Sequence, residues 1–166
     1  MNYLREAFNY NHEDGYLVWK PLNDNFVHIR NGKIQNNVSP MSRVKPGSVA
    51  GKLGFGDYKI KQDGVVKCGL RMIWQHVTGE FTMSKIRTMN PRDTRFCIDN
   101  LYMVPSDQTR VHKDRAKNSM VVSWSFEHKK FTVVDVDNYY NKTILSYHQD
   151  IEDALEALNK PVVSFL

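Results

Sequence analysis

Basic side chains at helical spacing are the feature of this 166-residue chain that most directly suggests chemistry. Arg110, Lys113 and Lys117 are three and four residues apart, so they share one face if residues 106–117 form a helix. Lysines and arginines on such a face bind phosphates and release counterions, which favours DNA binding. The alternative is a basic helix that only faces solvent. The surrounding sequence holds four further arginines: Arg87, Arg92, Arg95 and Arg115.

The same region holds groups that bind hard divalent metal ions. They are Asp93, Asp99, Asp107 and His112. Three of them also have a structural interpretation. Asp93 follows Asn90-Pro91 in a turn pattern, Asp107 is a favourable charge in a first helical turn, and His112 is then a solvent-facing helical residue.

Other candidate metal ligands have weaker patterns. Cys68 and Cys97 lack the CxxC spacing of a zinc site, and two cysteines are too few for a disulfide framework. They indicate a reducing compartment, so we expect a cytoplasmic protein. His76 lies in an apolar helical pattern, where packing is the commoner role.

The formal net charge of +5 is unevenly distributed. Residues 41–117 hold 15 basic and 7 acidic side chains, a net +8, whereas residues 118–166 hold 4 and 7, a net −3. The basic middle favours a nucleic-acid partner. The acidic tail argues against phosphate binding there, so we interpret it as either a weak DNA contact or a protein-binding surface.

Hydrophobic periodicity and turn signals predict the elements that position these residues. We expect a helix at Tyr3–Phe8, a strand at Tyr16–Trp19, a long mobile loop over residues 21–46, a hairpin of Tyr58–Lys61 and Val65–Cys68, and a helix from Leu70 that ends at Thr78-Gly79. Residues 83–105 suit an irregular loop or ribbon. Ser106 is the expected N-cap of the basic helix.

The last 49 residues have a different pattern. Three strand-like runs, Met120–Phe126, Lys130–Val136 and Lys142–Tyr147, precede a helix that Asp150 caps. We therefore expect a β-β-β-α module behind a linker at residues 110–119. The length suits one domain or two small ones. We expect no membrane segment and no signal peptide, because no apolar run is long enough.

Several phrases of the sequence occur in the order and spacing of a known family. The matching residues are Leu4, Phe8, Tyr10, Gly15, Leu17, Trp19 and Lys20, then Gly47, Ala50 and Gly51, then Gly56, Tyr58, Ile60, Asp63 and Gly64, then Arg71, Ile73, Trp74, Thr78 and Gly79. The tail, WSFEHKKFTVV…ILSY…DIEDALEALNK, has the tryptophan, strands and helix of an Apetala-type module. The chain resembles phage HNH-type homing endonucleases with a C-terminal Apetala-type DNA-binding domain.

The resemblance implies catalytic positions that this chain does not keep. The family has consecutive Asp and His residues, with the histidine as the general base, and these align with Arg87-Thr88. Its earlier histidine aligns with Leu70 and its metal-side asparagine with Thr109, whereas the Asn-Leu step that closes a hairpin is kept as Asn100-Leu101. Threonine does not act as a base near neutral pH. We therefore expect an inactive site without a cofactor, and Mg²⁺ or Mn²⁺ only if the four candidate ligands rebuild a metal site.

The resemblance further implies an α+β fold: an HNH-like ββα remnant with a strand-rich N-terminal extension over residues 1–115, and a three-stranded sheet plus helix over residues 119–166. It implies phage origin, a bacterial host cytoplasm, and DNA contact by Trp124, for which a core role is the alternative. We expect a DNA-binding protein that has lost cleavage. Two alternatives stay open: a protein-binding inhibitor of a host defence or transcription component, and an active endonuclease with a rebuilt site.

Overall fold

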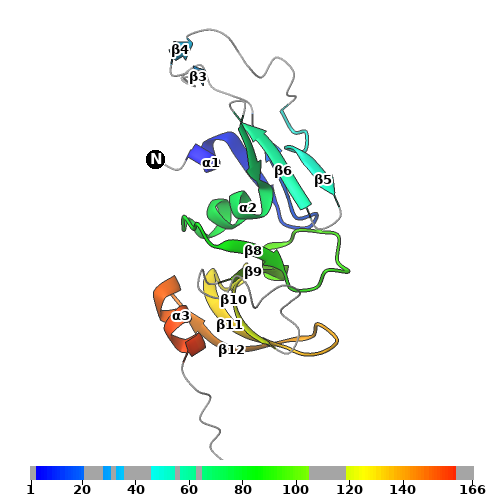
Figure 1. Cartoon of the computed structure of the whole chain (residues 1–166), viewed down its shortest axis with the longest axis vertical. Coiled ribbons are helices and arrows are strands. Elements are labelled where there is room, and N and C mark those ends of the chain that lie inside the picture. Colours follow the sequence, from blue (N-terminus) through cyan, green and yellow to red (C-terminus); the bar gives the residue numbers. More distant parts are fainter. Residues whose placement is uncertain are drawn as a thin grey trace, which may run out of the picture. The chain divides into compact units, whose positions relative to one another are not determined.

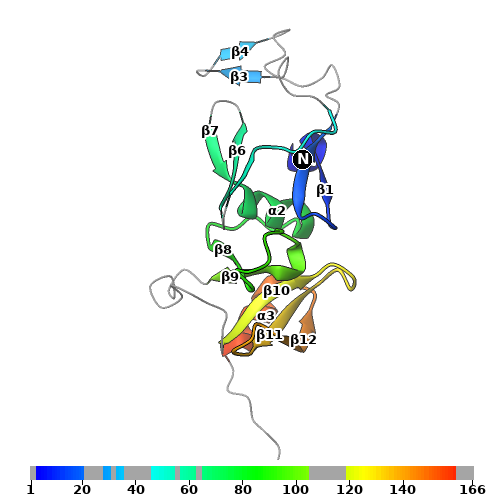
Figure 2. The same ribbon diagram turned by 90° about the vertical axis from the view of Figure 1, so that its right-hand side faces the viewer.

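The structure, a computed structural model of the whole chain, describes residues 3–20, 28–30, 33–35, 46–54, 57–62, 65–104 and 119–159. The chain folds as two compact units, Met1–Glu80 and Phe81–Leu166. Both combine antiparallel strands with short helices, so the chain is α+β, as expected (Figures 1 and 2). The helices of the described ranges are all too short or too polar to cross a membrane.

The first unit consists of two hairpins, a three-stranded sheet and two helices (Figure 1). In chain order its elements are α1 (Tyr3–Ala7), β1 (Phe8–Asn11), β2 (Tyr16–Trp19), β3 (His28–Arg30), β4 (Lys33–Gln35), β5 (Lys52–Gly54), β6 (Asp57–Gln62), β7 (Val65–Cys68) and α2 (Gly69–Thr78). β1 pairs with β2, β3 with β4, and β6 lies between β5 and β7.

Many of the residues that carry the family resemblance form the core of this unit. The buried ones are Leu4, Phe8, Leu17, Trp19, Ala50, Tyr58, Ile60, Ile73 and Trp74. The Tyr58 hydroxyl donates a hydrogen bond to the Ala50 carbonyl oxygen (2.6 Å) and accepts one from the Leu17 N–H (3.2 Å). Burial raises the pKa of Tyr58 to about 12. Gly69, the first residue of α2, packs so closely against Tyr58 that a Cβ there would lie 2.3 Å from its ring.

The end of α2 is fixed by contacts from the N-terminal segment. Gly79 adopts φ +83° and its N–H bonds the Gln75 carbonyl (3.0 Å), which ends the helix where the sequence predicts. The Arg5 guanidinium donates to the carbonyl oxygens of His76 (2.9 Å) and Val77 (3.3 Å). The His76 ring is partly buried, with Nε2 3.0 Å from the Phe8 carbonyl oxygen, a packing role.

The second unit is built on one five-stranded antiparallel sheet, in the order β12-β11-β10-β9-β8. Its elements are β8 (Lys85–Thr88), η1 (Ile98–Asn100), β9 (Leu101–Val104), β10 (Ser119–Ser125), β11 (Lys130–Val136), β12 (Lys142–His148) and α3 (Ile151–Asn159). α3 contacts β10, β11 and β12. The predicted order of three strands and a helix in the tail is therefore confirmed.

The tail sheet continues into the preceding hairpin. Val122 and Ser123 of β10 pair with Met103 and Tyr102 of β9, and the Ser123 hydroxyl donates to the Leu101 carbonyl oxygen (2.6 Å). Every side chain of β9 is buried, as is typical of a strand covered on both faces. This pairing explains why the two units divide at Glu80, whereas the sequence suggested a division near residues 115–119.

The sequence-based predictions of secondary structure miss three short strands, β3, β4 and β5. The predicted loop over residues 21–46 is wrong for β3 and β4, which pair across the Asn31-Gly32 hairpin signal. The sequence pattern does not predict β5 either. Strands of three residues have too little alternation to detect. The predicted helix over residues 106–117 lies outside the described residues.

Candidate nucleic-acid interface

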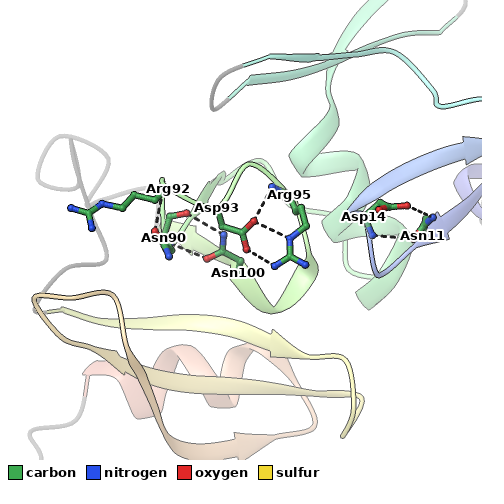
Figure 3. A network of polar contacts seen from close by, with 7 residues as sticks. All are labelled: Asn11, Asp14, Asn90, Arg92, Asp93, Arg95 and Asn100. Carbon is green, nitrogen blue, oxygen red and sulfur yellow. Dashed lines mark hydrogen bonds and ion pairs between the residues drawn. The ribbon is translucent and has the colours of Figure 1, made fainter.

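The connection between β8 and β9 is closed by the side chain of Asn100. Its Oδ1 accepts a hydrogen bond from the Asn90 N–H (2.9 Å), and its Nδ2 donates to the Asn90 carbonyl oxygen (3.3 Å). The Asn100 carbonyl oxygen accepts a third bond, from the Met89 N–H (2.7 Å). Asn100 therefore joins the two ends of the loop (Figure 3). This is the hairpin-closing position implied by the resemblance.

Asp93 has the turn role that its sequence context suggests. Its N–H bonds the Asn90 carbonyl oxygen (3.2 Å), and its carboxylate accepts two hydrogen bonds from the Arg95 guanidinium, at 3.0 and 3.1 Å (Figure 3). This pairing with Arg95 holds the pKa of Asp93 below its usual value. The carboxylate is thus engaged within the loop.

Asp99 ties the loop to the other strands of the sheet. Its Oδ1 accepts a hydrogen bond from the Phe126 N–H (3.1 Å), and its carbonyl oxygen accepts one from the Lys142 amino group (2.5 Å). The partners are 27 and 43 residues away in the chain, so no local pattern could have indicated this role.

The described residues do not assemble a metal-ligand set. They contain no group of three or more histidine, cysteine, aspartate or glutamate side chains that could hold a metal ion. Asp93 and Asp99, two of the four candidate ligands, bind protein donors instead. The other two, Asp107 and His112, lie outside the part of the chain that the structure describes.

The positions where the resemblance places catalytic groups fall in both units. Arg87 and Thr88 lie on β8, opposite Tyr102 and Leu101 of β9, and strand alternation points them to opposite faces of the sheet. Leu70 is buried in α2 of the first unit. Thr109 is outside the described residues. Arg87 and Thr88 are thus partly buried residues of a paired strand, and Leu70 is a buried residue of a helix.

The predicted DNA-contacting residues are in different environments. Arg92 is exposed, and Figure 3 shows its guanidinium extending away from the polar network of the loop. Arg95 is also exposed but holds Asp93, and Arg87 is partly buried. Trp124 is 8% exposed and packs edge-on against Phe131, with ring centroids 4.8 Å apart, which is a core position. Four predicted contacts are not among the described residues: Arg110, Lys113, Arg115 and Lys117.

The loop presents one exposed guanidinium group, that of Arg92. A guanidinium group presents donors in a planar fork that matches phosphate oxygens, and Arg92 carries one on the loop surface. The loop's two carboxylates already accept hydrogen bonds from protein groups.

Comparison of the chain with protein-family models, with curated proteins and with solved structures gave no match.

Proposed function

We propose that this protein binds duplex DNA without cutting it, using the β8–β9 loop together with the basic segment over residues 106–117. The observation that carries the proposal is the loop itself. Asn100 closes it, Arg92 extends from it, and the Asp93 carboxylate is paired with the Arg95 guanidinium, which offsets its repulsion of phosphate.

The distribution of charge supports the same proposal. Residues 41–117 carry a net +8, and within this range the segment over residues 106–117 holds four basic and two acidic side chains. Each lysine or arginine that contacts a phosphate releases a counterion, which drives binding regardless of sequence. Contacts of this kind position a protein on DNA, while sequence is recognised through contacts to the bases.

The residue types at the two positions where the resemblance implies catalytic groups support binding without cleavage. Hydrolysis of a phosphodiester needs a group that deprotonates water and ordinarily a metal ion that stabilises the leaving oxygen. Thr88 has no basic group for the first task. The Arg87 guanidinium repels a metal cation, so it does not support the second.

The test measures binding and cleavage of the same DNA by the full chain. We expect a fluorescein-labelled duplex to bind the protein and plasmid DNA to stay intact with Mg²⁺ or Mn²⁺. Arg92→Gln should weaken binding about three- to tenfold, since it removes one phosphate contact. The matched control is Lys129→Gln, an exposed cation of the β10–β11 turn whose ammonium lies over the Phe126 ring, 3.3 Å from its centroid.

Two results would overturn the proposal. One is metal-dependent nicking of the plasmid that disappears in Asp93→Ala or His112→Ala. The other is equal affinity of the Arg92→Gln and Lys129→Gln variants, which would remove the loop from the DNA contact.

A further inference from the structure

The three-stranded sheet of the first unit has one face lined with lysines. In its register Lys52 lies opposite Lys59, Lys59 opposite Cys68, and Lys61 opposite Val66. Directly opposite residues share a face, and so do residues two apart on one strand. Lys52, Lys59 and Lys61 therefore project from the same side of the sheet, which we name the lysine face.

The core fixes which side of the sheet this face occupies. Tyr58 and Ile60 alternate with the lysines of β6, and both are 0% exposed because they pack into the core of the unit. Lys59 and Lys61 must then point outward. All the described side chains on the lysine face are exposed, including Val66 and Cys68 of β7.

The arrangement of charge on this face is unfavourable for the isolated protein. Like charges directly opposite on neighbouring strands destabilise a sheet, and Lys52 and Lys59 are such a pair. Among the described side chains of the face, one carboxylate compensates: Asp57, 2.9 Å from the Lys59 amino group. Both groups of that ion pair are more than half exposed, so the pair is weak. An external anion across the face would relieve the repulsion.

We infer that the lysine face binds the phosphate backbone of duplex DNA. It forms a second, sequence-independent contact surface besides the β8–β9 loop, so the inference rests on the proposed function. Alternate residues of a strand are about 6.6 Å apart, so Lys59 and Lys61 can contact phosphates of one DNA strand at the same time.

The hairpin itself offers a matched pair of variants for the test. Lys61 on β6 lies on the lysine face, whereas Lys67 on β7 lies opposite Ile60 and therefore on the other face. Both are exposed, and replacing either by glutamine removes one positive charge from the same hairpin. A change in net charge alone affects the two variants equally.

The experiment titrates the full chain with a labelled duplex at several KCl concentrations and plots the logarithm of the association constant against that of the salt concentration. We expect Lys61→Gln to make the slope shallower by about 1 and the double variant Lys52→Gln/Lys61→Gln by about 2, because each lost phosphate contact releases fewer counterions. Lys67→Gln should keep the slope of the unaltered chain. Circular dichroism checks that each variant is folded.

The outcomes separate this inference from the proposed function. If the unaltered chain binds DNA but Lys61→Gln and Lys67→Gln have the same slope, the lysine face is not a contact and only this inference fails. If the unaltered chain does not bind duplex DNA at low salt, the proposed function and this inference both fail.

Discussion

At the scale of single residues, the geometry of the β8–β9 loop depends on Asn100. Its side chain makes two hydrogen bonds to the backbone of Asn90, at the other end of the loop. Asn90 and Asn100 are ten positions apart in the sequence, so these bonds of the Asn100 side-chain amide close a loop that is longer than a turn. Arg92 lies two residues after Asn90, and its N–H donates a hydrogen bond to the Asn90 side-chain oxygen (3.0 Å).

Replacing the clamp should therefore open one end of the loop. In Asn100→Ala we expect the Asn90 amide hydrogen to exchange at least about fivefold faster, the effect of losing roughly 1 kcal/mol of local stability. The Met89 amide bonds the backbone carbonyl of residue 100, so it is the internal control and should change less. Hydrogen exchange followed by NMR measures both. Equal changes at the two amides would contradict a clamp made by the side chain.

His76 makes the stability of the first unit depend on pH. Burial lowers the pKa of His76 below its ordinary value of 6.5, and the Arg5 and Lys20 charges add to this shift. The unfolded chain then binds more protons than the folded chain just below pH 6.5. The free energy that neutral His76 contributes to folding is therefore fully present above pH 6.5. It is lost as the pH falls from 6.5 to the lower pKa of His76 in the folded chain.

The His76→Gln variant isolates this effect, because glutamine keeps an N–H donor toward the Phe8 carbonyl oxygen and does not titrate. We expect urea unfolding, followed by the fluorescence of the buried Trp19 and Trp74, to show a larger stability loss from pH 7.5 to 5.5 in the unaltered chain than in His76→Gln. The same loss in both proteins would show that another group controls the pH response.

At the scale of elements, the tail is part of a larger sheet. β10 pairs with β9 on one side and β11 on the other, and Asp99 bonds Phe126 and Lys142 of the tail. Removing the tail leaves β9 at the edge of the sheet, because β10 is its neighbour on that side. It also exposes apolar side chains of β9, all of which are buried in the intact unit.

Truncation tests this continuity. We expect the fragment of residues 1–118 to keep protected amides in β6 and α2 but to lose protection in β8 and β9, and the fragment of residues 119–166 to be unfolded. Two-dimensional NMR spectra of the fragments and of the intact chain provide the comparison. A well-dispersed spectrum of the 119–166 fragment would show that the tail is an independent module.

The elements that the sequence predicts correctly are those with strong local signals. Gly79 ends α2, and Asp150 precedes α3 at the position predicted for its cap. The β9–β10 pairing has no such signal, because its partners are joined by a segment without hydrophobic alternation and their match depends on long-range packing.

The same distinction applies to the candidate site. The turn role of Asp93 follows from Asn90-Pro91, while its ion pair with Arg95 and the bonds of Asp99 depend on tertiary geometry. The lysine face has a local signal that the charge distribution alone does not reveal: Lys59 and Lys61 alternate with the apolar Tyr58 and Ile60.

At the scale of the whole molecule, the two proposed DNA contacts lie in separate units. The first has the lysine face, and the second has the β8–β9 loop with Arg92. The tail, with its net charge of −3, belongs to the second unit.

The most direct test of the central claim is a salt titration of the unaltered chain with duplex DNA in the presence of Mg²⁺, with the DNA recovered and analysed on a denaturing gel. We expect the association constant to fall by more than about tenfold between 50 and 200 mM KCl, as contacts to several phosphates require. The recovered strands should be intact. Binding that does not change with salt, no binding at low salt, or cut strands would each contradict a protein that binds DNA without cleaving it.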